Sequence, residues 1–346
     1  MQAGRTSRLP SNPMVMHTIE LGPETLRGYF SRDVTPAVTI DSGDSVCCQT
    51  LDAGWGGLEQ VDPCRAPISF EPRDRGRDFG HALTGPIAVR GARPGMTLEI
   101  RFRTIRVGAW GWSAGAKLPS QLDARLGLGG GASGPPPVIT VPTGEQVTLW
   151  TLEADKQMAR THSGLSIATR PFLGVVGMPA DEPGIQTTFP PRFCGGNLDC
   201  KELVEGSSLF LPIAVEGGLL SLGDGHAVQG DGEVAGPALA CPMARVEVEI
   251  VLHPDLRLSM PRAKTPIGWL TFGFHADVNE AWALATEEML KLMGELYHFP
   301  PKSALALASL VVDLRITQVV NGVRGVHAVL PHGAIRGAGS EEGRAS

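Results

Sequence analysis

Hydrophobic and polar residues alternate along much of the first two thirds of the chain, in short runs separated by glycine, proline and aspartate. Residues 244–253 (ARVEVEIVLH) show the pattern most clearly, with Val246, Val248 and Ile250 on one side and glutamates on the other. Successive side chains of a strand point to opposite faces, so this period of two predicts a strand with one buried face. Comparable runs predict strands at residues 38–46, 85–107, 136–141, 147–154, 208–215 and 219–224.

The last third of the chain changes to a helical period. Residues 277–298 repeat apolar side chains at intervals of three and four, and Asp277 stands where an N-cap is expected. A second helix is predicted over residues 303–316, with Ser303 as its cap. Together these patterns predict a mainly β, sandwich-like fold with a smaller α+β part at the C-terminus.

The length of 346 residues exceeds that of most single domains, so one large domain or two closely packed ones are expected. The 44 glycines and 28 prolines fit a chain of short strands, because both residues interrupt regular structure. We predict a disordered lead-in at residues 1–16, a β-rich unit at 17–175, a second β-rich unit with the C-terminal helices at 176–335, and a frayed tail at 336–346.

Composition argues against several classes of protein. The formal net charge of −6 provides no positive field for nucleic acid, and no apolar run reaches the roughly 18 residues of a membrane span. The N-terminal residues carry no apolar segment of the signal-peptide type, so a cytoplasmic location is expected. The six cysteines form no C-x-x-C pair and are expected to be reduced thiols rather than disulfides or zinc ligands.

Candidate chemistry is concentrated in two glycine-rich corners that two apolar runs separate. The first corner, residues 195–199 (GGNLD), contains Asn197 and Asp199, which point the same way if the backbone is extended. The second corner, residues 223–233 (GDGHAVQGDGE), gathers carboxylates, an imidazole and an amide within a few positions. Its glycines let the backbone bend so that these side chains can converge. The polar candidates of the second corner are Asp224, His226, Gln229, Asp231 and Glu233.

An imidazole surrounded by carboxylates suits zinc or another first-row divalent ion. Such an ion polarises an amide carbonyl and lowers the pKa of bound water, and a nearby carboxylate then transfers the water proton to the leaving nitrogen. Glu233 and Asp199 are the leading candidates for that base, and His226 is the leading metal ligand. Asn197 either ligates through its amide oxygen or orients the substrate.

The same residues have a simpler interpretation. Aspartate, asparagine and glycine are also the commonest turn residues, so a Gly-Asp-Gly-His corner is equally typical of a tight loop. A calcium loop of the D-x-D-x-D-G type is not present in this region. The metal-site hypothesis therefore depends on whether the two corners meet in space.

The residues from GGNLD through SSLFLPIAVEGGLLSLGDGHAVQGDGEVAG (195–236) resemble the acetamidase/formamidase family. Residues 83–102 (LTGPIAVRGARPGMTLEIRF) are similar to a second segment of that family, except that Met96 stands where an aspartate is usual. Residues 303–331 are similar to a third. The resemblance extends from about residue 17 to residue 332.

This resemblance implies an amidohydrolase that converts formamide, acetamide or similar short linear amides to the acid and ammonia. It also implies a bound divalent metal, zinc first and calcium as the alternative, a β fold of two similar units, and a homo-oligomer, which we take to be a dimer. The functional positions carried over are Asn197, Asp199, His226 and Glu233. Asp52, in QTLDAGWGG, resembles an acidic position of the family and is added to the other expected metal ligands, His226, Asp199 and Glu233.

Several other residues are candidates with a structural alternative. His81, Gln229 and Asp224 are expected to line the substrate pocket, although a histidine at the start of a strand often only forms a hydrogen bond. Cys194 and Cys200 flank GGNLD, but a catalytic thiol needs a base and an activated thiolate, and the sequence assigns them no role.

Two rival hypotheses remain open. An amidase with a serine or cysteine nucleophile is disfavoured, since the serines at 207–208 adjoin an apolar strand and lie outside any G-x-S-x-G motif. The second rival is an inactive or differently specific small-molecule-binding protein of the same fold, since fold alone does not establish activity. Chelation of metal separates the first rival from a metal hydrolase, and an ammonia assay separates the second.

Overall fold

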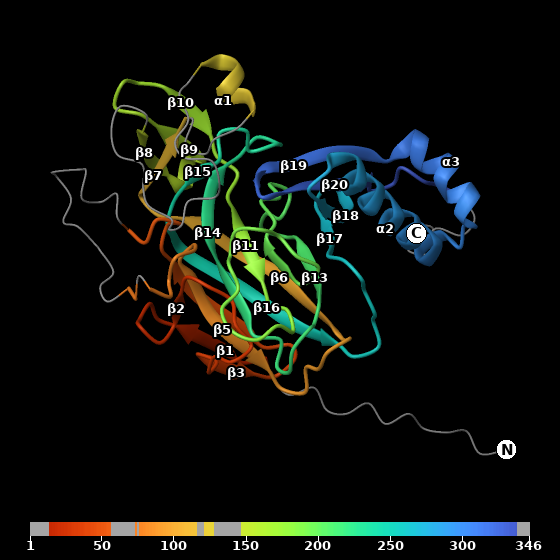
Figure 1. The fold of residues 1–346 in the computed structure, drawn as a ribbon, viewed down its shortest axis with the longest axis horizontal. Coiled ribbons are helices and arrows are strands. Elements are labelled where there is room, and N and C mark those ends of the chain that lie inside the picture. Colours follow the sequence, from red (N-terminus) through yellow and green to blue (C-terminus); the bar gives the residue numbers. More distant parts are fainter. Residues whose placement is uncertain (1–13, 57–72, 75, 116–120, 128–146, 338–346) are drawn as a thin grey trace.

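The computed structural model describes residues 14–56, 73–74, 76–115, 121–127 and 147–337. Two large β-sheets make up most of these residues, and two helices pack together at one end of the molecule (Figure 1). The sequence therefore predicted the fold class correctly, as a mainly β protein with a small α+β part at the C-terminus. The predicted strand at 136–141, Cys64, and most of the predicted lead-in and tail lie outside the described residues.

The first sheet has nine strands and is almost entirely antiparallel, the pairing of β1 with β4 being parallel. Its longest ladder joins β6 to β16, whose predicted alternation is confirmed: Val246, Val248 and Ile250 are buried. The strands in spatial order are β1 (Met16–Ile19), β4 (Ser45–Thr50), β16 (Met243–His253), β6 (Thr97–Val107), β13 (Ser208–Pro212), β17 (Arg262–Thr265), β18 (Gly268–His275), β20 (Val323–Pro331) and β19 (Asp313–Asn321).

The second sheet has eleven strands, and β14 (Leu220–Val228) lies at its centre with pairs to β11, β15 and β5. Eight of the nine residues of β14 are buried, which explains its apolar residues but not the Asp224 and His226 among them. The other strands are β10 (Ser166–Ala168), β9 (Met158–Arg160), β8 (Val147–Glu153), β7 (Trp110–Ala114), β15 (Leu239–Ala240), β11 (Phe172–Gly177), β12 (Gly195–Asn197), β5 (Leu83–Val89), β2 (Leu26–Arg27) and β3 (Val38–Ile40).

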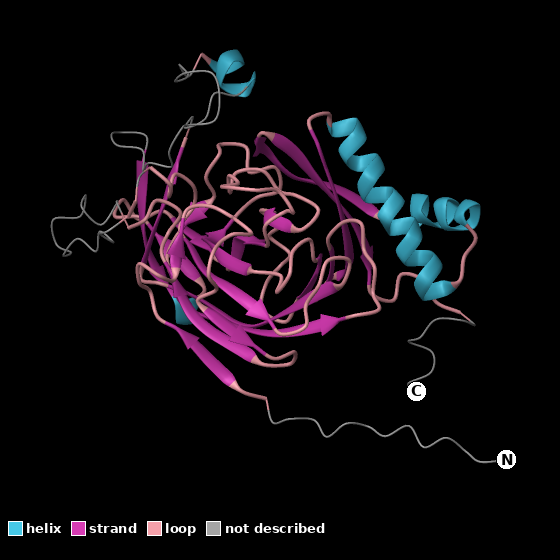
Figure 2. Ribbon diagram, turned by 60° about the horizontal axis from the view of Figure 1, so that its bottom comes forward, coloured by secondary structure: helices cyan, strands magenta, loops and turns pink. Residues whose placement is uncertain are grey.

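One buried apolar cluster joins the two sheets. It combines Ile100 and Phe102 of β6 with Leu173 of β11 and Leu222 of β14. Figure 2 shows the strands surrounding this shared interior, with the helices outside it. Burial of so many aliphatic side chains between two sheets is the main stabilising contribution in a sandwich. Each sheet takes strands from both halves of the chain, and the predicted boundary between residues 175 and 176 lies within β11, so the division into two units stays a prediction.

The C-terminal helices pack on the end of the first sheet. Helix α2 (Val278–Tyr297) begins as predicted, because the side chain of Asp277 accepts a hydrogen bond from the Asn279 backbone N–H. The buried face of α2 packs against Ala328 and Leu330 of β20. Two short helical segments lie elsewhere, α1 (Gln121–Leu126) and the 3-10 helix η2 (Ala154–Lys156). No helix of the described ranges is both long and apolar enough to cross a bilayer.

The second predicted helix was wrong at both ends. Helix α3 spans Pro301–Val311, with Pro300 in place of Ser303 as the cap, and the chain is already a strand from Asp313 onward. The β-branched pair Val311 and Val312 disfavours further helix, and the residues that follow pair with β20. Strand β1 begins at Met16, the last residue of the predicted lead-in.

Strands β19 and β20 form a hairpin with a buried histidine inside it. His327 is fully buried on β20; its Nδ1 lies 2.8 Å from Thr317 Oγ1, while Nε2 has no hydrogen-bond partner in the described part of the chain. Burial lowers the pKa of His327 from 6.5 to about 4, and the surrounding charges partly cancel: two carboxylates raise it and two cations lower it. These charges belong to Asp231, Glu202, Arg315 and Lys201. The imidazole is therefore neutral near pH 7.

We expect a His327→Leu variant to lose less stability in acid than the wild type does. The unfolded chain protonates this histidine below pH 6.5 and the folded chain only near pH 4, so the unfolded state binds more protons in that window. The free energy of unfolding of the wild type should therefore decrease as the pH is lowered from 6.5 to about 4, by about 3 kcal/mol at most from this group. Urea unfolding near pH 7 and near pH 4.5 measures the difference. The exposed His162→Leu is the control, and an unchanged pH dependence in His327→Leu would contradict the assignment.

Candidate active site

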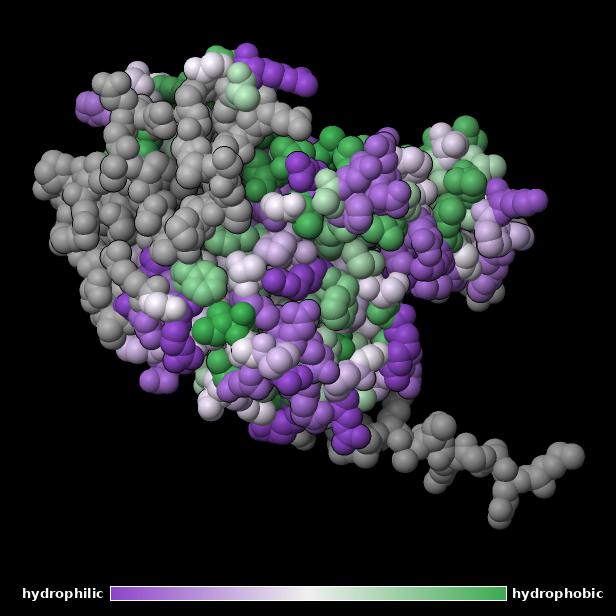
Figure 3. All heavy atoms as spheres, viewed as in Figure 1, coloured by the Kyte–Doolittle hydropathy of each residue, from purple (hydrophilic) through white to green (hydrophobic). Residues whose placement is uncertain are grey.

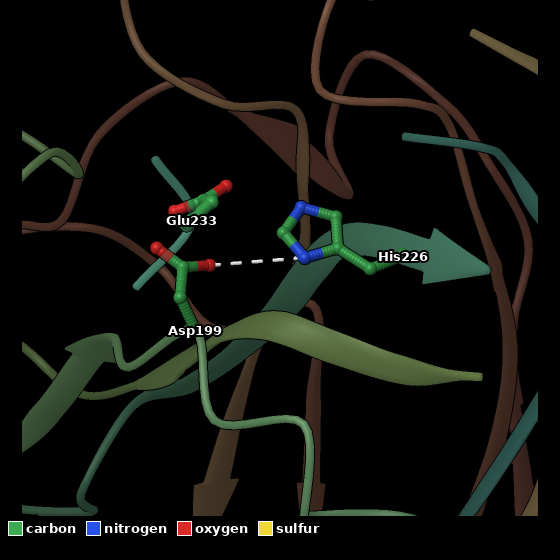
Figure 4. A group of neighbouring side chains, drawn as sticks. All are labelled: Asp199, His226 and Glu233. Atoms are coloured by element: carbon green, nitrogen blue, oxygen red, sulfur yellow. Dashed lines mark ion pairs between the residues drawn. The ribbon is translucent and has the colours of Figure 1, made fainter. Parts of the chain in front are cut away.

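The two glycine-rich corners meet in space. Asp199, His226 and Glu233 each present a ligand atom within 4.8 Å of the other two, and their residues are 1%, 2% and 7% exposed. Figure 4 shows the three side chains converging, with the carboxylates of Asp199 and Glu233 next to each other and both beside the imidazole of His226. Ionisable side chains buried together, two of them carboxylates, are costly unless they share protons or bind an ion. The arrangement thus meets the geometric condition on which the metal-site hypothesis depended.

Strand β11 is the element that joins the two corners. It pairs with β14 on one side, where Phe172 lies opposite His226, and with β12 on the other, where Val175 lies opposite Asn197. The backbone N–H groups of Leu198 and Asp199 both donate to the carbonyl oxygen of Gly174, at 2.9 and 3.2 Å. The first corner is therefore attached directly over the centre of β11.

Gly174 forms the floor of the site. A methyl group at this position would lie 2.5 Å from Asp224 Oδ2, 2.6 Å from Asp199 Oδ1 and 2.9 Å from His226 Cε1. These three side chains therefore converge on one point above the strand, which a glycine leaves open. The sequence analysis missed this residue, although a glycine inside the apolar run FLGVV indicates a close approach to the backbone.

Three of the four corner carboxylates have left-handed backbone conformations. The φ angles are 48° at Asp199, 54° at Asp224 and 45° at Glu233. Residues other than glycine seldom adopt positive φ, and where they do the surrounding structure must hold them there. Their concentration at one site indicates that the fold holds these carboxylates in place against local backbone preference.

Buried oxygens at the site have no hydrogen-bond donor in the described residues. They are Asn197 Oδ1, Asp199 Oδ1 and Glu233 Oε2. Buried polar atoms nearly always have a partner, so each unpaired oxygen indicates a ligand that the described residues do not supply. Two carboxylates, an amide oxygen and an imidazole are hard or borderline donors of the kind that divalent cations take. With the open point above Gly174, the donor set fits a cation.

Histidine 226 is held between acceptors on both ring nitrogens. Its Nε2 lies 3.2 Å from Asp224 Oδ1, and its Nδ1 lies 3.1 Å from Gln229 Oε1 and 3.8 Å from Asp199 Oδ1. Burial opposes protonation, but the charges of Asp224 and Asp199 and the hydrogen bonds to Asp224 and Gln229 together raise the pKa of His226. The ring orientation is therefore set by side chains of both corners.

The carboxylates of Asp199 and Glu233 are electrostatically unfavourable neighbours. Burial, opposed in part by the charge of His226, raises the pKa of Asp199 to about 6. Burial and then the charge of Asp199 raise the pKa of Glu233 well above its usual value. A carboxyl group with a raised pKa is suited to exchanging protons near neutral pH.

Gln229, whose place in the pocket stays a prediction, links the two corners. Its Nε2 donates to the backbone carbonyl of Asp199 at 2.7 Å, while its Oε1 faces His226. His81 lies farther out: its Nε2 is 3.9 Å from Asp224 Oδ2, and its Nδ1 is 2.8 Å from Thr188 Oγ1. Thr188 was not predicted, because it lies 107 residues from His81 in the sequence.

Asp52 is buried near the site but is not one of the three residues of the cluster. Its oxygens accept hydrogen bonds from the backbone N–H groups of Gly54 and Gly56 and from Trp112 Nε1. Burial raises its pKa, although those donors partly oppose the shift. Its role as a metal ligand stays a prediction.

The two cysteines beside the first corner are buried. Burial raises the pKa of Cys194 to about 11 and that of Cys200 higher still. The Cys194 thiol donates to the Met178 carbonyl oxygen at 3.2 Å. Thiols in this state are poor nucleophiles, because the thiolate is the reactive form.

Comparison with known proteins shows which family this part of the chain is similar to. The sequence profile of the Acetamidase/Formamidase family matches residues 179–267, the segment that carries both corners. The chain is a relative of the acetamidase/formamidase family. The acetamidase of Mycolicibacterium smegmatis is 37% identical over 118 residues, which are 29% of this chain and 28% of that protein. The formamidase of Methylophilus methylotrophus is 53% identical over 47 residues, or 14% and 12% of the two chains.

Solved structures resemble this chain over nearly its whole length, beyond the segment that the family profile matches. The acetamidase of Bacillus halodurans superposes with a TM-score of 0.72 at 26% identity, covering 90% of this chain and 97% of that one. A predicted acetamidase/formamidase of Thermoanaerobacter tengcongensis has the same fold, with a TM-score of 0.76 at 24% identity over 92% and 96% of the chains. In sequence, the chain spans 60% or less of the length of the three curated relatives that it matches.

Proposed function

We propose that this protein hydrolyses small linear amides of the formamide and acetamide type to the carboxylic acid and ammonia. The observation that carries the proposal is the buried cluster of Asp199, His226 and Glu233, with two unpaired carboxylate oxygens directed into it. The names of the acetamidase and formamidase relatives support the reaction class. The match of their family profile to both corners supports the location of the site.

We further propose that Asp199 and His226 hold a divalent cation, zinc first and calcium as the alternative, with Glu233 beside it. Asn197 Oδ1 offers a further oxygen, since it is buried and has no donor in the described part of the chain. A divalent ion at such a site polarises an amide carbonyl and lowers the pKa of water. The backbone attachment of Asp199 to Gly174 and the contacts of His226 keep these ligands in position.

Glu233 is the residue proposed to move the proton. In hydrolysis, the oxygen of water forms a bond to the amide carbon, and the bond from that carbon to nitrogen breaks. Glu233 accepts a proton from the water and returns it to the departing nitrogen, which leaves as ammonia. Its raised pKa suits both steps, and Asp199 lies close enough to share a proton with it. Asn197 is proposed to orient the substrate amide or to ligate.

Aromatic rings flank His226 and His81 and would limit the size of the substrate's acyl group. Phe172 packs edge-on against His226 at 5.1 Å between ring centroids, and Phe189 lies 5.4 Å from His81. We propose that His81 and Asp224 line the substrate side of this space. Rings so close to the polar cluster favour short acyl chains over long ones.

We also propose that the protein forms a homo-oligomer, with the dimer as the simplest case. Hydrophobic side chains gather on the surface over β19 and α3 (Figure 3). Exposed apolar patches of this kind are typical of interfaces between protein chains. The exposed residues are Leu305, Leu310, Leu314 and Ile316.

The function is tested by metal removal. We expect purified protein to release ammonia from formamide and acetamide, to lose this activity on dialysis against a chelator, and to regain it when zinc is added back. Circular dichroism should show that the chelated protein stays folded. Activity that survives chelation would favour a covalent amidase. If the metal-loaded protein produced no ammonia yet bound acetamide in calorimetry, it would be a binding protein of this fold.

A further inference from the structure

The C-terminal hairpin extends into the candidate site, although no residue of it was predicted to do so. Asn321, at the end of β19, is buried, and its Nδ2 donates a short hydrogen bond to Asp199 Oδ2. The two residues are 122 positions apart in the sequence. Because this amide holds Oδ2, the other oxygen of Asp199, Oδ1, lies toward His226 Nδ1 at 3.8 Å and has no hydrogen-bond donor in the described residues.

The side chain of Gln318 builds the turn that places Asn321. Gln318 is fully buried, and its Oε1 accepts from the backbone N–H groups of Val320 at 2.8 Å and Asn321 at 3.0 Å. Its Nε2 donates to the carbonyl oxygen of Val323 at 3.0 Å. The register between β19 and β20 shifts at this point, so the glutamine replaces the missing ladder bonds.

The same hairpin is bonded to the second corner. The N–H of Gly232 donates to the Thr317 carbonyl oxygen at 3.0 Å, and the N–H of Val319 donates to the Gly232 carbonyl oxygen at 3.1 Å. Gly232 directly precedes Glu233, so β19 is bonded to the backbone next to Glu233. Through Asn321 it is also bonded to the side chain of Asp199. An ion pair at 2.9 Å between Nη1 of the half-buried Arg315 and Oε1 of the buried Glu202 adds a third attachment.

We infer that Asn321 is a positioning residue, which fixes the rotation of the Asp199 carboxylate so that Oδ1 faces His226. This inference rests on the proposed function. A carboxylate can turn about its last torsion, and a donor at one oxygen decides which oxygen faces inward. An amide does not titrate, so it remains a donor at every working pH. Hydrogen bonds to ligating side chains typically change metal affinity 10- to 100-fold when removed, on the order seen for outer-shell partners.

Two variants of Asn321 test this role. Asn321→Ala removes the donor, and Asn321→Asp keeps the shape and the backbone bond to Gln318 while replacing the donor with an oxygen. Zinc affinity is measured with a competing chromophoric chelator at about pH 8, beside kcat and KM for formamide. Asn279→Ala is the matched control, because Asn279 Nδ2 donates to Asp277 Oδ1 at 3.1 Å on the exposed start of α2.

Both Asn321 variants are expected to bind zinc about 10 to 100 times more weakly and to have lowered kcat with little change in KM, while the control matches the wild type. Wild-type affinity and kcat in Asn321→Asp would overturn the inference. So would a failure of both variants to fold, since the residue would then serve folding alone. If the wild type binds zinc but releases no ammonia, the proposed function fails, and the zinc affinities still decide the role of Asn321.

Discussion

Replacement of Gly174 by alanine is expected to inactivate the protein without unfolding it. The added methyl group would lie 2.6 Å or less from oxygens of Asp224 and Asp199 and 2.9 Å from the His226 ring. These contacts are all with side-chain atoms, so the strand can stay in place while the three side chains move outward. Displacement of reacting groups by about 1 Å is enough to lower kcat about 100-fold. With three groups displaced together, we expect a loss of at least that size and weaker zinc binding.

The matched control for this variant is Gly230→Ala. Gly230 belongs to the second corner but has open space where a methyl group would be added, and its φ is not in the left-handed region. This variant should keep the activity of the wild type. Formamide hydrolysis, zinc titration and thermal unfolding are measured on both variants. An active Gly174→Ala protein would mean that the point above β11 is not where the reaction takes place.

The corners were predictable because each is local in the sequence. Asp224 and His226 are two positions apart on a strand, and the surrounding glycines indicate bends, so their common orientation follows from the period of a strand alone. Gly174 and Asn321 were missed for the opposite reason. Each reaches the site only through pairing between distant segments, β11 with β14 and the hairpin with residue 232. Neither pairing has a signature in the residues themselves.

The elements of the fold were likewise predicted correctly where the signal is local and incorrectly where it depends on contacts between distant segments. The alternation in β16 and the N-cap at Asp277 are local, and both were predicted correctly. The end of α3 was not, because Leu314 and Ile316 continue an apolar pattern that suits a helix as well as a strand. Pairing with β20 decides between the two, and it depends on contacts that short apolar runs do not specify.

Glu233→Gln is expected to lower kcat by about 10² to 10⁴, the usual contribution of a general base, with a smaller change in KM. The substitution keeps the shape of the side chain and removes only the carboxylate whose Oε2 is unpaired. Asp231→Asn is the control: Asp231 is two residues away, pairs with Lys201 at 2.8 Å and lies outside the cluster. Steady-state kinetics on formamide compares the two variants with the wild type.

The same variant should stabilise the metal-free protein. Burial and then the charge of Asp199 raise the pKa of Glu233, so at neutral pH the folded state holds a carboxyl group that the unfolded chain ionises more readily. An acid whose folded pKa exceeds its unfolded value lowers stability at every pH above the unfolded value, and a neutral glutamine removes that penalty. We therefore expect a higher melting temperature together with the lost activity, which is the pattern of a residue retained for chemistry rather than for folding. A Glu233→Gln protein that melts at a lower temperature than the wild type and hydrolyses formamide at the wild-type rate would instead make Glu233 a structural residue.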